Sequence, residues 1–242
     1  MIVMLEGSDM FIKSAALYDA IYSWKNYADE AEKIHALIQK HKRSSGNTLL
    51  DVGCGTGAHI THLQNFYVAE GLDLDDQLLE VARQRHPDTA FHHGDVADFN
   101  LSHTYDVIVS LFSAIGYVKT VARLNQTMQT LARHLTRGGV ILIEPWFTPD
   151  VFKVGTPHAT FVNEPDLKIA RMNVSHVEGN VSILDFHYLL ATKQGIEYFT
   201  EHHELGMFTR EEFAFAFQQT DLKMIYDEQG VDGRGLYIGT KP

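Results

Sequence analysis

The sequence predicts an α/β protein whose mostly parallel sheet is interrupted by an antiparallel insertion. Segments typical of strands and helices alternate between residues 45 and 146, which implies crossover connections and parallel strands. The runs "VIVSLF" and "VILIE" are apolar without alternation, as expected for strands covered on both faces. From Phe147 to His203 the pattern changes to strand-like runs separated by the turn signals "EGN" and "KQG".

The first segment predicts helices. In "SAALYDAIYSWKNYADEAEKIHALIQKHKR", apolar residues recur at helical spacing, at Leu17, Ile21, Ala31, Ile34, Leu37 and Ile38. The segment ends in basic residues, which complement the carboxyl end of a helix. We therefore expect residues 1–44 to form leading helices that act as a lid.

Residues 45–146 carry the alternation that predicts the parallel sheet. The expected strands are "TLLDVG", "YVAEGLDL", "TAFHHGD", "YDVIVSLF" and "GGVILIEPW". The expected helices are the segment from Gly57 to Phe66, "DDQLLEVARQRH" and "ARLNQTMQTLARHL". Polar residues that follow these strands are expected to meet at the carboxyl edge of the sheet.

The rest of the chain is expected to contain the insertion, residues 147–205, and a return to the main sheet, residues 206–242. In the return, "TREEFAFAFQQT" predicts a helix, since Thr209 with Glu212 three residues later forms a capping-box pattern. "LKMIYDEQG" and "GLYIGTKP" predict two further strands. We expect a single domain over residues 1–242, in which the insertion could cover the carboxyl edge of the sheet.

The composition favours a small-molecule partner. With 31 acidic residues against 20 Lys and Arg, the net charge of −11 argues against a nucleic-acid-binding face. The single cysteine, Cys54, excludes an internal disulfide and suits a reducing cytoplasm. The start "MIVMLEGSDM" lacks the pattern of a signal peptide, and no segment reads as a membrane span. We therefore expect a cytoplasmic protein that binds neither membrane nor nucleic acid.

The segment "LLDVGCGTGAHI" predicts a ligand-binding loop between a strand and a helix. Such a loop presents backbone amides and the positive end of a helix dipole, and glycines let a ligand lie against bare backbone. Its glycines, Gly53, Gly55 and Gly57, have the spacing G-x-G-x-G. Dinucleotide folds use G-x-G-x-x-G to hold a pyrophosphate, so this loop suits a ligand without a phosphate there.

Two aspartates follow the next strands. Asp73 lies twenty residues after Gly53, where a carboxylate can accept both hydroxyls of a ribose. Asp95, in "HGDVADF", would lie at the same edge and could accept from an adenine amine. The alternatives are that both are solvated strand ends, that Asp51 is a turn residue and that Cys54 is merely small.

These signals in this order resemble the class I S-adenosylmethionine-dependent methyltransferases over residues 45–145. The resemblance implies a Rossmann-like seven-stranded sheet, mostly parallel, with a terminal antiparallel hairpin. It implies a cofactor site in which Asp51 and the three glycines hold the methionyl end, Asp73 the ribose, and Asp95 with the backbone of Val96 the adenine. Leu111, Tyr18 and Tyr27 are further cofactor-binding candidates, the tyrosines as a lid over the sulfonium. A nicotinamide-dependent oxidoreductase is the rival that the glycine spacing and the "GD" strand end disfavour.

Further stretches resemble one subgroup, the nucleotide-linked aminosugar N,N-dimethyltransferases. They are "LYD", "NYADEA", "FSAIGYVKT", "VILIEPWF", "EGN", "FHY" and "GRGLYIG". The resemblance implies an amino group on a nucleotide-activated sugar as the acceptor. The chain departs from the subgroup at Val174 and Val177, where the similar enzymes tend to have His and Arg, and at Met10, which replaces a tyrosine beside Phe11. A local shift could bring His176 to the missing histidine.

Methyl transfer to an amine mainly requires that a neutral nitrogen be held behind the methyl carbon. Tyr117 stands where the similar enzymes carry His or Tyr beside the amine, and a neighbouring group could take the ammonium proton. Glu144 could attract a cationic amine and Trp146 could bound the sugar pocket. Alternatively, Tyr117 packs a loop and "EPW" is a strand stop set by Pro145.

A nucleotide sugar also carries a pyrophosphate, which needs cations. Arg171 in the insertion and Arg234 in "GRGL" are the candidates, and Ser175 could add a hydrogen bond. An exposed turn arginine and an ordinary strand serine are the alternatives.

No metal site is expected among the histidines. His187, His202 and His203 lie in neighbouring strands of the insertion, but adjacent residues in a strand point to opposite faces. The remaining alternatives are an O- or N-methyltransferase of another small metabolite and a non-catalytic protein that binds S-adenosylmethionine. Strand edges of the insertion could pair two copies in a homodimer.

Overall fold

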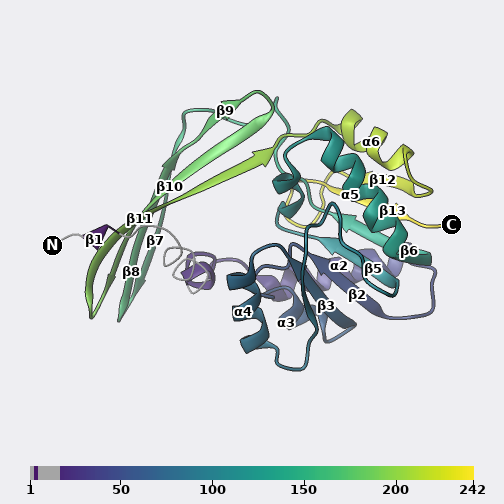
Figure 1. Cartoon of the computed structure of the whole chain (residues 1–242), viewed down its shortest axis with the longest axis horizontal. Helices are drawn as coiled ribbons and strands as arrows, with labels where there is room; N and C mark the ends of the chain where they lie inside the picture. The colour runs from purple at the N-terminus through teal and green to yellow at the C-terminus, as the bar shows by residue number, and fades with distance from the viewer. Residues whose placement is uncertain (1–2, 5–16) are drawn as a thin grey trace.

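The structure is a computed structural model that describes residues 3–4 and 17–242. Figure 1 shows an α/β body from which a long antiparallel sheet projects. The sheet of the body has seven strands in the order β12-β13-β6-β5-β2-β3-β4. Its strands are β2 (Thr48–Val52), β3 (Val68–Asp73), β4 (Phe91–His93), β5 (Tyr105–Ser110), β6 (Leu135–Ile143), β12 (Lys223–Asp227) and β13 (Leu236–Thr240).

Strands β2 to β6 run parallel, and β13 pairs antiparallel with both β6 and β12. The predicted fold class, a mostly parallel seven-stranded sheet with a terminal antiparallel hairpin, is therefore confirmed. The helices are α2 (Tyr27–His41), α3 (Ile60–Leu63), α4 (Asp76–Arg85), α5 (Val121–His134) and α6 (Arg210–Gln218), with a 3-10 helix η1 (Ala114–Val118).

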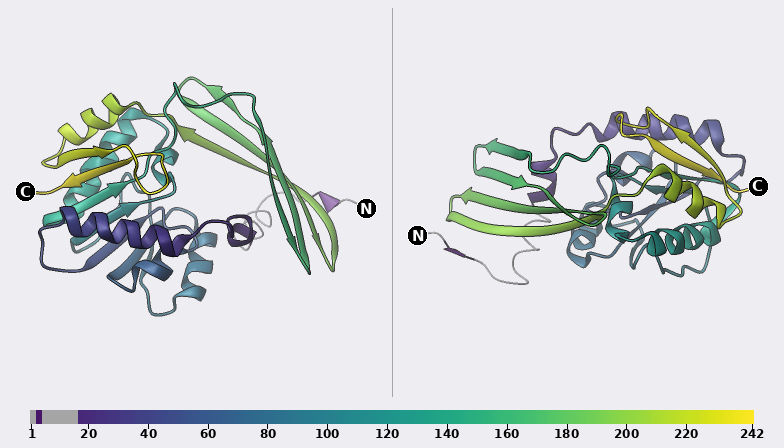
Figure 2. Two further views of the ribbon diagram at one scale, coloured as in Figure 1. Left: turned by 180° about the vertical axis from the view of Figure 1, so that it is seen from behind. Right: turned by 90° about the horizontal axis from the view of Figure 1, so that it is seen from above.

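Helices cover both faces of this sheet (Figure 2). Side chains of β5 alternate between the two resulting cores, because neighbouring strand residues point to opposite faces. Ile108 packs with residues of α5 and α6, whereas Val107 and Val109 pack with residues of α2 and α3. This double burial explains why the strand reads as a continuous apolar run.

The helix starts follow local capping chemistry. The Asn26 side chain accepts from the backbone amide of Asp29 at the start of α2. The Thr209 and Glu212 side chains form the predicted capping box at the start of α6. Each cap fixes the residue at which the helix begins, and this positions the loop residues that precede the helix.

Two elements are shorter than predicted. The helix expected from Gly57 to Phe66 is reduced to α3, because Gly57 has a φ of 72° and the residues before α3 form turns. The strand expected in "TAFHHGD" is reduced to β4, which lies at the edge of the sheet. An edge strand has one pairing partner and so fewer hydrogen bonds to extend it.

The predicted insertion forms a sheet of its own, in the order β1-β11-β10-β8-β7 with β9 beside β10. Its strands are β1 (Val3–Met4), β7 (Pro157–Glu164), β8 (Leu167–Val174), β9 (His176–Glu178), β10 (Val181–Thr192) and β11 (Gly195–Gly206). Residues 17–21 are helical and pack against it, where Leu17 and Ile21 contact an apolar cluster that includes Tyr188 and Phe199. The sheet meets the body through this segment and through the end of β11, which contacts η1.

None of the helices in the described ranges is long and apolar enough to cross a membrane. Met10 and Phe11, at which the chain departs from the similar enzymes, lie outside the described residues.

Candidate active site

The glycine loop follows β2 at the carboxyl edge of the sheet. Gly53, Gly55 and Gly57 all have positive φ, at 74°, 54° and 72°, a conformation that favours glycine. A Cβ atom at Gly53 would clash with the Cβ atom of Ala114, so this glycine lets η1 pack against the loop. A Cβ atom at Gly55 would have no neighbour within 4 Å. The loop is therefore closed on one side by η1 and open at Gly55, where a ligand has room.

Two carboxylates flank the loop. Asp73 accepts from the backbone amides of Gly55 at 2.7 Å and Asp75 at 3.0 Å. Asp51 is 1 % exposed, and its Oδ2 has no hydrogen-bond partner among the described residues. Burial, and to a lesser degree the charge of Asp73, raises the pKa of Asp51 to about 7. A buried carboxylate oxygen without a partner fits a cationic ligand group.

The turn between β5 and η1 is strained. Phe112 and Ser113 have φ values of 51° and 63°, which cost about 1–3 kcal/mol per non-glycine residue. The backbone amide of Phe112 donates to Oε2 of Glu144 at 2.7 Å, and the Ser113 hydroxyl donates to the carbonyl of Pro145 at 2.8 Å. The end of β6 therefore holds the turn that begins η1.

Tyr117 lies on η1 and is 51 % exposed. Its hydroxyl is 2.8 Å from Nδ1 of His203 on β11. The charge of Asp73 contributes to raising the pKa of Tyr117, and Tyr117 contributes to raising the pKa of Tyr18. Tyr117 thus stands between the glycine loop and the antiparallel sheet.

Aromatic residues of the leading segment lie against this turn. The rings of Tyr18 and Tyr22 are 4.6 Å apart, and the Tyr22 ring meets the Phe112 ring edge-on at 5.1 Å. Lys25 lies 4.5 Å over the Phe112 ring and forms a buried ion pair with Glu30. The leading segment therefore contacts the turn that begins η1.

The comparisons with known proteins agree with this geometry. Residues 49–139 match the family model described as a methyltransferase domain. The chain is 36 % identical, over 94 % of its length and 98 % of the relative, to dTDP-3-amino-3,4,6-trideoxy-alpha-D-glucopyranose N,N-dimethyltransferase of Streptomyces venezuelae. It is also 36 % identical, over 93 % of its length and 89 % of the relative, to dTDP-3-amino-3,6-dideoxy-alpha-D-glucopyranose N,N-dimethyltransferase of Streptomyces fradiae.

The chain belongs to the S-adenosylmethionine-dependent methyltransferases. The methyltransferase resembles the solved structure of Streptomyces venezuelae DesVI with a TM-score of 0.89 and 34 % identity, over 98 % of this chain and 100 % of that one. It resembles S-adenosylmethionine-bound CalS10, an amino pentose methyltransferase, with a TM-score of 0.84 and 33 % identity, over 98 % of both chains. The cofactor is S-adenosylmethionine, as predicted, and the acceptor is a small molecule.

The residues at the loop fit this cofactor. The partnerless oxygen of Asp51 suits the methionyl ammonium, and the open space at Gly55 suits the body of the ligand. Asp73 still has lone pairs for a ribose hydroxyl, because a carboxylate can accept about four hydrogen bonds. The Tyr27 hydroxyl is also buried without a hydrogen-bond partner in the described part of the chain, and burial raises the pKa of this phenol.

Asp95, which is predicted to bind the adenine, has a cationic partner that the sequence does not predict. Arg123 on α5 donates to both oxygens of Asp95 at 2.7 Å, and the Ala97 amide donates at 2.9 Å. Burial alone would raise the pKa of Asp95, but the hydrogen bond from Arg123 lowers it below its usual value. Val96 is half-buried beside Asp95, whereas the Leu111 side chain is buried in the core beneath α2. Leu111 can therefore contact a ligand mainly through its backbone.

The structure brings Glu144 and Arg234 together as ion partners. Glu144 is 2 % exposed, and its Oε1 lies 2.6 Å from Nη2 of Arg234, which also lies 2.6 Å from Asp232. Arg234 further donates to the Ser113 hydroxyl at 2.9 Å. Two carboxylates thus offset the Arg234 charge, and Glu144 is buried behind the turn that it holds. This arrangement favours a structural role for both residues over contact with an amine or a pyrophosphate.

The other residues that were predicted to bind the acceptor do not lie together. Arg171 lies between the rings of Tyr22 and Phe186, at 5.1 and 4.6 Å, and so faces the lid segment. Trp146 donates to the Ser182 hydroxyl at 2.8 Å and lines a pocket of about 520 Å³ that also includes Arg234. The Ser175 hydroxyl is buried and donates to the carbonyl of Lys153 at 3.4 Å.

The predicted opposite orientation of two histidines is confirmed. His203 faces Tyr117, whereas His202 contacts Asp185 at 2.7 Å. Within the described ranges, no group of three or more His, Cys, Asp or Glu side chains is arranged to hold a metal ion.

A latch between the lid and the glycine loop was not predicted. Asp19 forms an ion pair with Arg85, whose Nη1 donates to the carbonyl of Thr56 at 2.8 Å. The Thr56 hydroxyl in turn donates to Asp19 at 3.0 Å. Asp19 and Arg85 are 66 residues apart, so no local sequence pattern marks them as partners.

We expect Asp19→Asn to weaken binding of S-adenosylhomocysteine about 3- to 10-fold. The ion pair with Arg85 contributes about 1 kcal/mol to the closed position of the lid, and this free energy is lost from cofactor binding in the variant. The melting temperature should fall by less than about 4 °C, because the ion pair is partly exposed. Calorimetry and thermal unfolding measure the two effects. Asp29→Asn, which removes an exposed ion pair within α2, is the control. Unchanged affinity in Asp19→Asn would show that the latch has no part in cofactor binding.

Proposed function

We propose that the methyltransferase transfers methyl groups from S-adenosylmethionine to the amino group of a nucleotide-linked aminosugar. The observation that carries this proposal is the match to relatives over nearly the whole chain, including the antiparallel sheet. The printed names of these relatives specify amino groups of dTDP-linked deoxysugars. A relationship through the cofactor half alone would say much less about the acceptor.

The geometry supports an acceptor amine beside Tyr117. The side chain is half exposed, the glycine loop lies behind η1, and the antiparallel sheet lies in front of it. When bound, the cofactor supplies an electrophilic methyl carbon, so the protein mainly has to hold a neutral amine in line with it. Arg171, which donates to the Tyr22 hydroxyl at 3.0 Å, is the cation that we propose for the acceptor side.

The test is turnover with dTDP-3-amino-3,6-dideoxy-α-D-glucopyranose and S-adenosylmethionine, followed by mass spectrometry. Addition of one and then two methyl groups supports the proposal. The matched control is the corresponding dTDP-sugar with a hydroxyl in place of the amine, which should stay unmodified. Methylation of the hydroxyl sugar would favour an O-methyltransferase. Tight binding of S-adenosylhomocysteine without methylation of any dTDP-aminosugar would favour either another metabolite as the acceptor or a non-catalytic protein that binds the cofactor.

We also propose that residues 1–242 work as one domain in the cytoplasm, without a nucleic-acid partner. The lid segment contacts the antiparallel sheet through Leu17 and Ile21 and contacts α4 of the body through Asp19, which ties the insertion to the body. Cys54 is a free cysteine, and cysteines that form no disulfide are typical of proteins in reducing compartments. Fluorescence microscopy of a tagged chain and a binding assay with duplex DNA test these statements.

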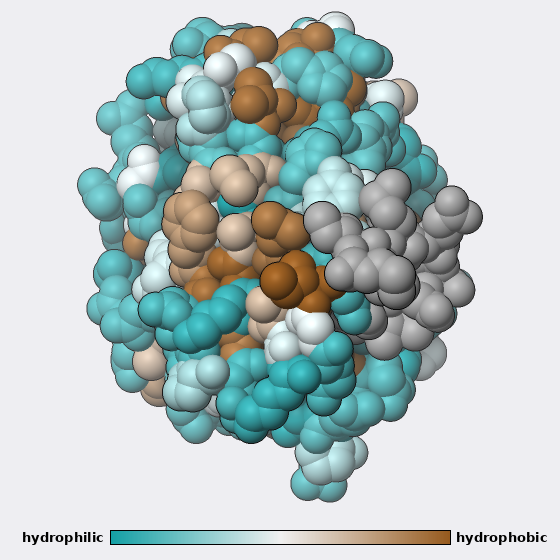
Figure 3. Space-filling model, turned by 90° about the vertical axis from the view of Figure 1, so that its left-hand side faces the viewer, coloured by the Kyte–Doolittle hydropathy of each residue, from teal (hydrophilic) through white to brown (hydrophobic). Residues whose placement is uncertain are grey.

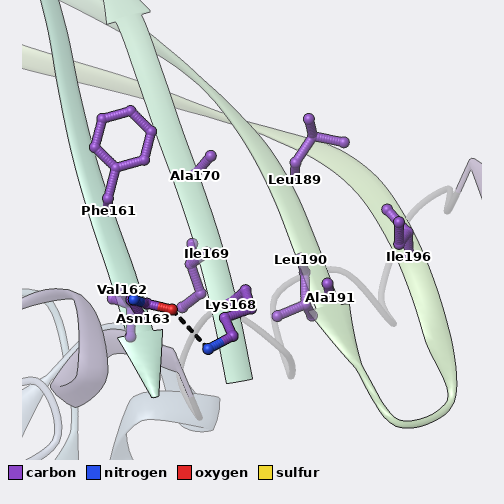
Figure 4. A pocket seen from close by; sticks show the side chains of 10 residues that line it. All are labelled: Phe161, Val162, Asn163, Lys168, Ile169, Ala170, Leu189, Leu190, Ala191 and Ile196. Atoms are coloured by element: carbon purple, nitrogen blue, oxygen red, sulfur yellow. Dashed lines mark hydrogen bonds between the residues drawn. The ribbon is translucent and has the colours of Figure 1, made fainter. Parts of the chain in front are cut away.

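A homodimer is the assembly that we propose. The face of the antiparallel sheet that points away from the lid exposes large apolar side chains, at Phe161, Met172, Val174, Leu189 and Ile196. Figure 3 shows hydrophobic residues gathered at the centre of the molecule's face on this side. In Figure 4, Phe161 and Leu189 line a pocket of about 480 Å³ that a partner side chain could enter. Contiguous exposed apolar surface of this kind marks association sites.

Light scattering after gel filtration should therefore give the mass of two chains. Phe161→Lys should shift the protein toward one chain, because it places a charge in the apolar face. Val154→Lys, which changes another exposed apolar residue that lies outside this sheet, is the control. A wild-type protein that elutes with the mass of one chain at every concentration tested would overturn the homodimer.

A further inference from the structure

Methylation of an amine at neutral pH has to dispose of a proton. An aliphatic amine is then mostly an ammonium ion, whose nitrogen has no free lone pair. Tyr117 is the polar group beside the expected acceptor position, but burial raises the pKa of this phenol above its ordinary value, so it is already protonated at neutral pH and keeps no second proton. A group behind Tyr117 is needed if the protein itself is to take the proton.

Such a group lies within hydrogen-bond distance. The Tyr117 hydroxyl is 2.8 Å from Nδ1 of His203, and Nε2 of His203 is 3.4 Å from a carboxylate oxygen of Glu201. A carboxylate can only accept, so Nε2 carries the proton in neutral His203. Nδ1 is then an acceptor, and Tyr117 donates to it.

The surrounding packing fixes this arrangement. A Cβ atom at Gly116 would lie 3.0 Å from the Leu205 side chain, so η1 is pressed against β11. The Tyr188 hydroxyl donates to the same oxygen of Glu201 at 2.6 Å, and the Phe186 ring lies 5.3 Å from the His203 ring. The carboxylate of Glu201 is therefore fixed in position by a hydrogen bond, and the imidazole of His203 packs against an aromatic ring.

We propose that His203, held by Glu201, accepts the proton of the acceptor ammonium through Tyr117. The inference rests on the proposed function, because it needs an amine acceptor. The ammonium proton passes to the oxygen of Tyr117 while the proton of Tyr117 passes to Nδ1 of His203. The nitrogen lone pair so released forms its bond to the methyl carbon as the carbon–sulfur bond breaks. The imidazolium pairs with Glu201 and loses its proton to water, since the His203 side chain is 28 % exposed.

In this scheme Tyr117 is the catalytic residue, and His203 and Glu201 are positioning residues that act through it. The other titratable groups around the chain of hydrogen bonds are already engaged. Lys119, just after η1, pairs with Glu204; Tyr22 accepts from Arg171, and Asp73 and Asp75 accept from backbone amides. Arg171 donates to the hydroxyls of Tyr22 and Thr160.

His202 provides a matched control. It is the neighbour of His203 on the same strand but faces the other way, where it contacts Asp185 at 2.7 Å and Glu204 at 3.4 Å. His202→Gln therefore changes the same residue type in the same strand without touching Tyr117.

The experiment is the pH dependence of kcat/KM for dTDP-3-amino-3,6-dideoxy-α-D-glucopyranose from pH 6 to 10. Wild type and His202→Gln should level off near neutral pH. His203→Gln should depend on solvent to deprotonate the amine, so its rate should rise about tenfold per pH unit and approach wild type at high pH. Glu201→Gln should fall between them. Calorimetry with S-adenosylhomocysteine should give the same affinity for all four proteins.

A second readout needs no turnover. In the protein without substrate, 15N NMR of the imidazoles, assigned by the signal lost in His203→Gln, should show Nε2 protonated in wild type. Glu201→Gln should weaken that preference. A rate loss in His203→Gln that is equal at every pH, or a proton found on Nδ1, would overturn the inference while leaving the proposed function intact. A wild-type protein that methylates no dTDP-aminosugar at any pH would overturn both.

Discussion

Replacing Asp51 with asparagine is expected to lower the affinity for S-adenosylhomocysteine about 10- to 100-fold at pH 7.5. A hydrogen bond between charged groups contributes about 1.5–3 kcal/mol, and each 1.4 kcal/mol is a factor of ten in affinity. Asp51 Oδ2 is buried and has no hydrogen-bond partner in the described structure, so the ligand ammonium is its expected partner. Isothermal calorimetry measures the change directly.

The same residue makes cofactor binding depend on pH. With a pKa of about 7 in the free protein, Asp51 is mostly protonated below pH 7, whereas the ammonium pairs with the ionised form. Binding then releases a proton, and the affinity should rise about tenfold per unit from pH 5 to pH 7 and level off above. Calorimetry in two buffers of different ionisation enthalpy counts the released proton. Asp51→Asn should show neither effect, and a flat wild-type profile would contradict the assignment.

Asp51 affects the stability of the cofactor-free protein in the opposite direction, since a rise in pH lowers this stability. Without cofactor, the folded chain holds a proton on Asp51 between pH 4 and pH 7 that the unfolded chain has already released. The stability contributed by this group is therefore present below pH 4 and is lost as the pH rises through 7. Added cofactor should offset this loss.

Arg234→Ala should destabilise the protein by about 3–5 kcal/mol, because it leaves the buried carboxylate of Glu144 without its ion partner. For a chain of this length, that loss lowers the melting temperature by about 6–20 °C. The turn at Phe112 and Ser113 would also lose one of its supports, since Arg234 donates to the Ser113 hydroxyl. Urea unfolding followed by circular dichroism measures the free energy.

The control is the double variant Glu144→Gln with Arg234→Met, which removes both buried charges and keeps the side-chain volume. Replacing a buried ion pair by groups of similar shape is often close to neutral, so most of the lost stability should return. The Asp232 carboxylate, which also pairs with Arg234, is partly exposed and can be solvated. An Arg234→Ala protein with unchanged stability but impaired binding of a thymidine nucleotide would restore the pyrophosphate role for Arg234.

The sequence predicts the fold and the cofactor half because both depend on local pattern. Continuous apolar runs mark strands such as β5 that are buried on both faces, and their carboxyl ends place Asp51 and Asp73 beside the glycine loop. The local pattern misjudges α3, since the left-handed Gly57 shortens a helix that periodicity alone would extend.

The sequence does not predict contacts between side chains that come together only in the tertiary structure. Glu144 and Arg234 each have a plausible separate role in the sequence, yet they are ion partners 90 positions apart. The contact between Tyr117 and His203 spans 86 residues, and that between Arg123 and Asp95 spans 28. No periodicity or spacing reports such pairs, because they form only when η1 packs on β11 and the start of α5 meets the loop after β4.

The antiparallel sheet leaves and rejoins the body at nearly the same place. A Cβ atom at Gly116 would touch both Trp146, just after β6, and Leu205, near the end of β11. The stretch between them therefore leaves and rejoins the body at one point, while β1 and residues 17–21 pack on it from the amino-terminal part of the chain. We expect an exchange of residues 147–206 with a related enzyme to leave the methyl-donor half intact and to alter the surface that faces the acceptor.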